Sequence, residues 1–358
     1  MSRQTAFLLV CTASLCLAVP AAAQEPAEHC TATHDYRRIY AFQDYQYFKP
    51  PIADVRSPKF SARAYRDEAL PFTSSTADGD HRFFDVSLGE HFPVLGANFY
   101  RDPPENCMEV RGLALALEAS AHTLIDLDTR SSDVVNTDFR VGAALVIRPL
   151  THWSLLWRFF HESTHLGDEF TLGAVVDSTF IRYNVSYEAH EALLAYDRYS
   201  PDQVTSIVPV YGRIYGGGRR YVQGFAKDWD GTFPAFEPDK PPLRLASLWE
   251  AQGGLEVFWR LFPDDDHPAR VRDSFLDHMV KPQLLYLAGD VANRSRYATT
   301  APVRTPWVHL AAGLVYGDFF QAERSVRWTL DFYDGPQPHG QFRSGDIRYW
   351  AVSFAIDF

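Results

Sequence analysis

The last eleven residues, R-Y-W-A-V-S-F-A-I-D-F from Arg348 to Phe358, decide the fold. Every second residue from Trp350 to Phe358 is large and apolar, whereas the residues between them are small or polar. Successive side chains of a β-strand point to opposite faces, so this period of two predicts a strand with one apolar face. A terminal strand of a soluble sandwich would alternate in the same way. The other end of the chain therefore has to indicate the compartment.

The N-terminus has the pattern of a secretory signal peptide. Arg3 is followed by an apolar run from Ala6 to Val19 and by Ala21-Ala22-Ala23 before Gln24. A positive start, a short apolar run and an A-x-A site are the three parts of such a signal. The run is too short to span a bilayer, and no other stretch approaches the ~20 apolar residues of a membrane helix. We expect residues 1–23 to be removed and the mature chain to lie beyond the inner membrane.

Because the chain is expected to be exported, its last strand can be compared with the strands of outer-membrane proteins. It resembles the C-terminal signal of bacterial outer-membrane β-barrels, in which the closing strand ends in Phe. The resemblance implies a Gram-negative outer membrane, with its lipids and lipopolysaccharide around the protein. It also implies an interaction with the barrel assembly machinery through the strand that ends at Phe358. The net charge of -11 argues against nucleic acid as a partner.

The rest of the chain repeats the strand pattern about twelve times. Short turns such as R-P-L-T and R-Y-S-P-D alternate with long connections at 166–180, 224–242, 290–305 and 334–346. Short periplasmic turns and long outer loops are typical of outer-membrane barrels, which also have even strand numbers. We therefore predict an all-β fold, a transmembrane antiparallel barrel over residues 51–358. Residues 24–50 would form a periplasmic N-terminal segment, and a break is expected in the second strand near Pro93.

Two cysteines remain after the signal peptide is removed, Cys30 and Cys107. A single pair in an oxidising periplasm is more often bridged than free. We predict a disulfide that ties the N-terminal segment to the periplasmic rim.

The strand that starts at His152 divides its residues between two surfaces. Trp153 to Phe159 alternate toward lipid, and His161, Ser163 and His165 continue that face. The opposite face and its neighbours predict a lumen charge cluster of Asp138, Arg140, Arg158, Glu162, Glu188 and His190. Barrels of this size are usually filled by side chains, so an ion-pair network is favoured over a general pore.

Three interpretations of His161-Glu162-Ser163-Thr164-His165 stay open. Polar residues at a strand end can simply mark the edge of the hydrocarbon layer. The H-E-x-x-H pattern would bind zinc on a helix, but the two histidines lie ~13 Å apart on a strand. The H-x-S spacing resembles outer-membrane phospholipase A and the lipid A deacylase, which implies Ser163 as nucleophile and His161 as base.

The hydrolase interpretation lacks a third residue to orient the histidine. The neighbouring positions expected to face outward offer no acid; they are Phe139, Val141, Tyr183, Val185 and Tyr187. Asp168 or Glu169 would have to fold back from the following loop. No cofactor is expected outside the distant zinc interpretation, and Ca²⁺ enters only under the hydrolase interpretation. Whether the chain is an enzyme stays undecided at this point.

Three longer stretches carry a further resemblance: I-A-D-V-R-S-P-K-F, S-T-H-L-G-D-E-F and F-Y-D-G-P-Q-P-H-G-Q-F. In this order they resemble a bacterial outer-membrane barrel family catalogued as domain of unknown function 1207. The resemblance implies the barrel and the membrane, and it carries no catalytic residues. We therefore expect an outer-membrane barrel of unresolved biochemical role, structural or transport-related, with lipid acyl hydrolysis and zinc hydrolysis as alternatives.

Overall fold

The structure is a computed structural model. It describes residues 39–42, 47–67, 81–99, 110–129, 131–171, 181–199, 208–223, 229–261, 282–299, 304–317 and 325–357. Cys30, Cys107 and Phe358, on which sequence predictions fall, lie outside the described residues.

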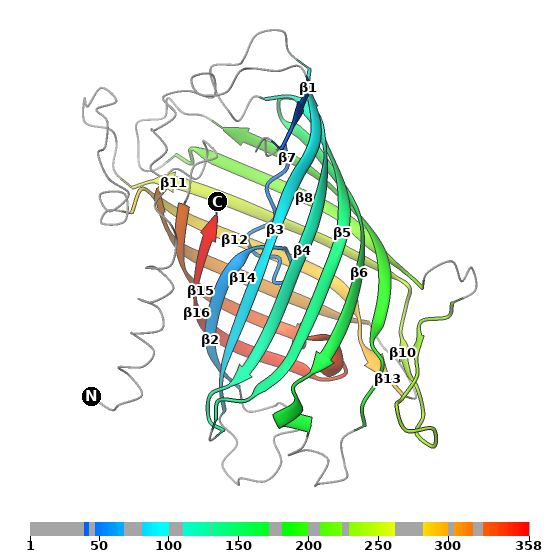
Figure 1. The fold of residues 1–358 in the computed structure, drawn as a ribbon. Coiled ribbons are helices and arrows are strands. Elements are labelled where there is room, and N and C mark those ends of the chain that lie inside the picture. The colour runs from blue at the N-terminus through cyan, green and yellow to red at the C-terminus, as the bar shows by residue number, and fades with distance from the viewer. Residues whose placement is uncertain are drawn as a thin grey trace, which may run out of the picture.

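The sheet closes on itself as an antiparallel barrel (Figure 1). Thirteen strands share the sheet, and without the short β1 (Ile39–Ala41) twelve of them form the wall. The wall strands are β2 (Phe60–Asp67), β3 (His81–Asn98), β4 (Gly112–Asp126), β5 (Val134–Leu150), β6 (Trp153–Leu166), β7 (Ser186–Tyr199), β8 (Tyr211–Val222), β11 (Trp249–Arg260), β12 (Leu284–Ser295), β14 (Arg304–Gly317), β15 (Ser325–Pro336) and β16 (Asp346–Asp357). The predicted fold class and strand number are confirmed.

The period-two pattern has the physical consequence expected of it. In β16, Ile347, Tyr349 and Ala351 are buried, and Trp350 and Val352 are exposed. The large apolar side chains of the other strands are also exposed on the outer face. A closed barrel pairs every backbone polar group within the sheet, so its outer face can meet hydrocarbon. Among the described residues, no helix is long and apolar enough to cross a bilayer.

The two ends of the barrel differ. The end at which β16 finishes, called the terminal end here, has the two-residue turn between β5 and β6. The opposite loop end holds the long connection between β8 and β11, with a small sheet of β9 (Thr232–Phe233), β10 (Leu243–Leu245) and β13 (Tyr297–Ala298). The break near Pro93 is a register shift between Pro93 and Leu95.

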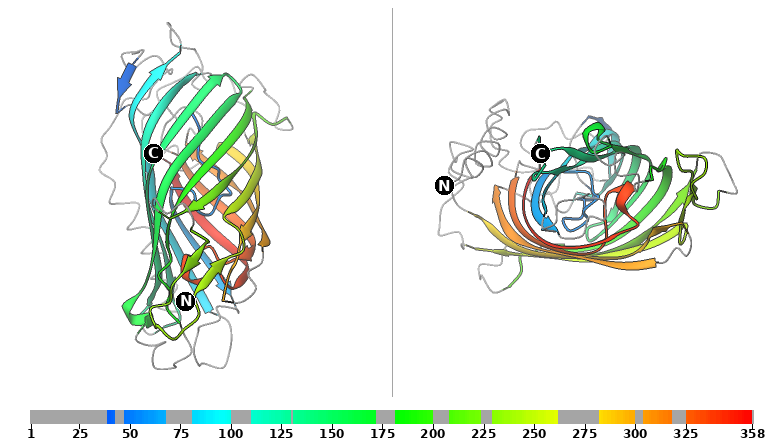
Figure 2. Two further views of the ribbon diagram at one scale, coloured as in Figure 1. Left: turned by 90° about the vertical axis from the view of Figure 1, so that its right-hand side faces the viewer. Right: turned by 90° about the horizontal axis from the view of Figure 1, so that it is seen from below.

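The segment before β2 runs inside the barrel (Figure 2). β1 pairs with the terminal half of β3, and β2 pairs with its other half on the same edge. Between them, Tyr47, Phe48 and the run from Pro51 to Ser57 are buried. We call residues 47–59 the plug.

Candidate functional site

Ion pairs with inward-facing strand residues hold the plug in the lumen. The Arg56 side chain forms ion pairs with Asp138 Oδ2 at 2.9 Å and Glu162 Oε1 at 3.1 Å. Arg140 donates through Nη1 to the Arg56 carbonyl at 2.9 Å and through Nη2 to Glu162 Oε2 at 2.7 Å. All four side chains are almost completely buried. This part of the plug is therefore fixed to both β5 and β6.

A second group of charges surrounds Asp54. Its carboxylate lies 3.9 Å from Arg158 Nη2 and 3.7 Å from Arg294 Nη2. Arg158 also pairs with Glu118 at 3.3 Å and with Glu191, which in turn accepts from Arg219 at 2.6 Å. Backbone contacts add to this, since Ile52 N–H donates to Glu256 at 2.7 Å. The lumen around the plug is occupied by paired charges of both signs.

Four of the six predicted lumen charges face inward and pair there: Asp138, Arg140, Arg158 and Glu162. The other two predictions, Glu188 and His190, are wrong. In β7 the buried positions are Tyr187, Ala189 and Glu191, so Glu188 and His190 lie on the outer face. The physical reason is that aromatic side chains fill the loop end of the lumen. Tyr187 points inward and donates its hydroxyl to Glu162 at 2.6 Å.

The outward position of Glu188 places its carboxylate beside His161, the histidine predicted as the base. β6 and β7 pair with His161 opposite Glu188 and Ser163 opposite Ser186. His161 Nδ1 lies 3.0 Å from Glu188 Oε1, and His161 Nε2 lies 3.4 Å from Ser186 Oγ. The side chains of His161 and Glu188 keep 42% and 21% of their exposure. A hydroxyl, an imidazole and a carboxylate thus form one chain of contacts on the outer face.

The serine predicted as nucleophile has a different partner. Ser163 Oγ lies 3.3 Å from His165 Nε2, and the His165 ring packs edge-on against Phe139 at 5.6 Å. The five residues His161 to His165 lie in β6, so the two histidines are separated along a strand and engage different groups. The zinc interpretation required a helix, and the strand does not provide one. Asp168 and Glu169, the conjectured third residues, are not needed, because Glu188 contacts His161.

Sequence reasoning missed Glu188 and Ser186 because it assigned Tyr183, Val185 and Tyr187 to the outer face. All three are buried. The signal that could have found the pair is in β7 itself. Ala192, Leu194 and Tyr196 alternate outward in its terminal half, and counting back from them gives the correct parity for Glu188.

The contact chain of Ser186, His161 and Glu188, called the outer site here, lies where the apolar outer face gives way to polar residues. In β6, Trp153, Leu155, Trp157 and Phe159 precede His161 on this face. His190 packs over Trp157 at 5.9 Å and Phe159 at 4.8 Å. The polar chain therefore lies at the edge of the apolar outer face.

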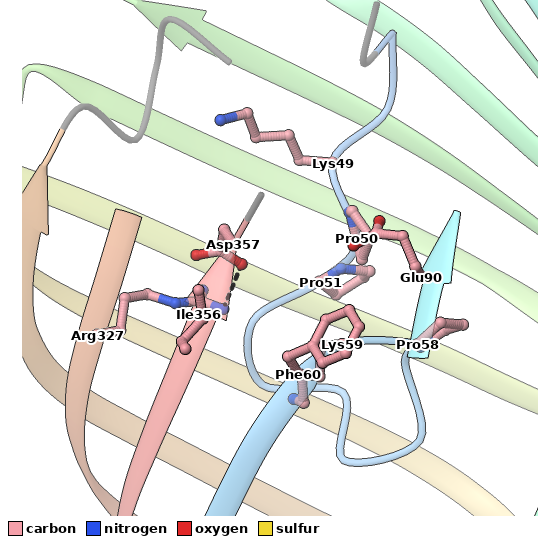
Figure 3. Close-up of a pocket in the computed structure, with 10 residues that line it drawn as sticks. All are labelled: Lys49, Pro50, Pro51, Pro58, Lys59, Phe60, Glu90, Arg327, Ile356 and Asp357. Atoms are coloured by element: carbon pink, nitrogen blue, oxygen red, sulfur yellow. Dashed lines mark hydrogen bonds and ion pairs between the residues drawn. The ribbon is translucent and has the colours of Figure 1, made fainter. Parts of the chain in front are cut away.

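Two other features of the described residues resemble binding sites. Within the described residues, His81, Asp126 and Asp128 are grouped closely enough to hold a cation. Arg82 already donates to Asp128 through Nε at 2.8 Å and lowers the pKa of that carboxyl by hydrogen bonding. At the terminal end, a cavity of about 50 Å³ lies between the plug and the Arg327–Asp357 pair (Figure 3). It is too small for a lipid.

The connection between β15 and β16 closes the loop end. It contains the short 3-10 helix η2 (Gly340–Phe342). His339 is buried between Asp85 at 3.5 Å and Asp138 at 3.6 Å, and Arg343 pairs with Glu250. Burial would lower the pKa of His339, but the charge of Asp85 and the contact with Asp138 raise it to about 9. The loop is therefore attached to the same carboxylate as the plug.

The chain matches a protein-family model over more than half of its length. A family model described as "Protein of unknown function (DUF1207)" matches residues 18–261. The chain belongs to this family. The closed barrel and its apolar exterior make the chain an outer-membrane β-barrel protein. The family assigns no reaction. No curated protein matches the chain at a significant level.

Solved structures with a similar fold are distant. Outer-membrane phospholipase A from Escherichia coli is 12% identical, covers 87% of this chain and 96% of its own, and has a TM-score of 0.43. The Salmonella typhi outer-membrane phospholipase dimer with bound calcium is 10% identical, with 84% and 90% coverage and a TM-score of 0.42. LpxR from Salmonella typhimurium is 7% identical, with 83% and 99% coverage and a TM-score of 0.32. Likenesses this distant carry no functional argument.

Proposed function

We propose that this protein hydrolyses acyl esters of membrane lipids at the outer face of its barrel. The observation that carries the proposal is the contact chain Ser186–His161–Glu188. A nucleophile, a base and a group that orients the base, in contact in this order, define a serine hydrolase site independently of fold. The position of the chain at the boundary of the apolar face supports a lipid substrate, because such a substrate would reach it from the membrane.

In this mechanism the Nδ1–H of His161 donates to Glu188, which leaves Nε2 free to accept a proton. Ser186 Oγ attacks the ester carbonyl carbon while its proton passes to His161 Nε2. The tetrahedral intermediate collapses, the alkoxide leaves with the proton from His161, and an acyl-serine remains. Water, deprotonated by the same histidine, then releases the fatty acid. Glu188 stabilises the imidazolium in both steps.

Ser163 has a supporting role in this proposal. It lies directly across from Ser186, at the short separation of a cross-strand pair. With His165 donating to its oxygen, the Ser163 O–H is available to donate to the oxyanion of the intermediate. Such donors are worth several kcal/mol in other hydrolases, roughly 3 each. The proposal thus assigns the nucleophile to Ser186 and keeps His161 as the base.

The sequence also left transport open as a function of the barrel. The plug and its ion pairs oppose it, since buried pairs occupy the lumen between β5, β6 and β12. A structural role would explain the plug but not the outer-face contact chain.

The test is fatty-acid release by the refolded protein from phospholipid and from lipid A, with and without Ca²⁺. Wild type should release fatty acid, Ser186→Ala and His161→Ala should not, and Glu188→Gln should be slower by about a hundredfold or more. Ser163→Ala, which removes the proposed oxyanion donor, should be slower by about a hundredfold. Heat-modifiable gel mobility verifies that each variant is folded.

Three results would overturn parts of this proposal. No release by wild type under any condition would reject the hydrolase. Activity in Ser186→Ala but not in Ser163→Ala would return the nucleophile to Ser163. Unchanged activity in Glu188→Gln would remove the carboxylate from the site.

The proposal includes the route to the membrane. Residues 1–23 act as a cleaved signal peptide, and the strand that ends at Phe358 engages the barrel assembly machinery. The loop end faces the outside of the cell, so the substrates are outer-membrane lipids, lipopolysaccharide included. The chain's own side chains supply the chemistry, and Ca²⁺ is a variable of the assay.

A further inference from the structure

We infer that Arg220 binds the phosphate group of the lipid substrate and so makes the outer site selective for phosphate-bearing lipids. The inference rests on the proposed function, because it adds a binding group to the same site. It starts from the neighbours of Glu188 on the outer face of β7 and β8.

Four outward side chains form a row across neighbouring strands. Strand pairing places Phe159 opposite His190, His190 opposite Arg220, and Arg220 opposite Trp249. His190, Arg220 and Trp249 are exposed, and so is Phe159. This row lies two residues from the His161–Glu188 pair, on the side of the apolar face. An arginine among three aromatic rings is thus the nearest outward cation of β8 to the proposed site.

Arg220 differs from the arginines of the lumen. Its guanidinium carbon lies 5.2 Å from the centre of the Trp249 ring, and in the described part of the chain it has no carboxylate at ion-pair distance. Arg219, the next residue, points inward and pairs with Glu191. A guanidinium stacked on an aromatic ring keeps its N–H groups directed outward from the ring edge. An unpaired cation in that setting is suited to an anion supplied by the membrane.

The spacing fits a lipid that spans both groups. From Ser186 to Arg220 is one strand sideways, about 5 Å, and four residues along, about 13 Å, or about 14 Å between α-carbons. The Arg220 side chain lies over Trp249 of β11, on the side of β8 away from β7. A lipid that spans both groups would have its ester at Ser186 and its phosphate at Arg220. Arginine matches phosphate oxygens with two parallel hydrogen bonds, which a neutral lipid cannot accept in the same way.

The experiment measures hydrolysis of phosphatidylglycerol, lipid A and diacylglycerol in mixed micelles. Arg220→Gln should lower kcat/KM on both phosphate-bearing lipids by about ten- to a hundredfold, mainly through KM, and leave diacylglycerol unchanged. Arg220→Lys should recover part of the loss. Arg198→Gln is the matched control, because Arg198 is an exposed arginine on β7 near its terminal end. The two phosphate-bearing substrates separate phospholipid from lipid A as the preferred source.

A second measurement does not need hydrolysis. Quenching of Trp249 by brominated phosphatidylglycerol, with Trp249→Phe as the background, should exceed quenching by brominated diacylglycerol, and Arg220→Gln should abolish the difference. If wild type hydrolyses nothing but this difference is present, the proposed function fails and the phosphate site stands. Equal effects of Arg220→Gln on all lipids, or equal quenching by both probes, would overturn the inference.

Discussion

Replacing Arg56 with methionine keeps an unbranched apolar stem and removes the charge that holds the plug. Arg56 is 2% exposed and pairs with Asp138 at 2.9 Å and Glu162 at 3.1 Å. Removing one partner of a buried ion pair typically costs roughly 3–5 kcal/mol, because the other charge is left without compensation. Glu162 would keep Arg140, and Asp138 would keep Asn136, which donates to it at 2.7 Å. The lower value, about 3 kcal/mol, is therefore expected.

The assay is reversible urea unfolding in detergent, followed by tryptophan fluorescence. Arg348→Met is the matched control, since Arg348 pairs with Asp334 at 2.6 Å while its side chain is 71% exposed. Exposed pairs contribute about 0–1 kcal/mol, so that variant should unfold close to wild type. The double variant Arg56→Met/Asp138→Asn should recover about 1 kcal/mol or more of the loss. Equal stability of Arg56→Met and Arg348→Met would refute the view that these ion pairs hold the plug.

Three further outcomes are expected. The His339 pKa of about 9, against an ordinary 6.5, means that its protonated form stabilises the fold below pH 6.5 and that this is lost as pH rises through 9. The difference in unfolding free energy between wild type and His339→Gln should therefore fall by about 3 kcal/mol between pH 6 and pH 10, with a flat difference contradicting the assignment. Gly217→Ala should destabilise the barrel by about 1–3 kcal/mol, because the new Cβ would clash with the Ala192 carbonyl oxygen, which is backbone and cannot move aside. Gly212→Ala in the same strand meets nothing within 4 Å and serves as its control in the same unfolding assay. In planar bilayers, wild type should stay at the baseline and Asp54→Asn/Arg56→Met should show intermittent openings; steady conductance by wild type would mean that the plug does not seal the lumen.

Period-two alternation predicted the barrel, the strand number and the outward position of His161 and Ser163, because these depend only on local parity. The alternation failed where large apolar side chains face the lumen and not the membrane. Tyr183, Val185 and Tyr187 are apolar enough to suggest a lipid face, yet they fill the loop end of the lumen. One wrong parity moved Glu188 and Ser186 to the wrong side of the wall. The plug could not be predicted from the sequence for another reason. Asp54 and Arg56 pair with residues more than 80 positions away, and no local pattern encodes such contacts.

The plug is joined by covalent bonds to β1 on one side and to β2 on the other. It therefore behaves as a ligand tethered at both ends, whose effective concentration in the lumen is set by chain length and not by dilution. β2 follows the plug directly and closes the wall by pairing with β16 at six positions, from Phe60 to Tyr65. The plug is therefore anchored at the edge where the wall closes.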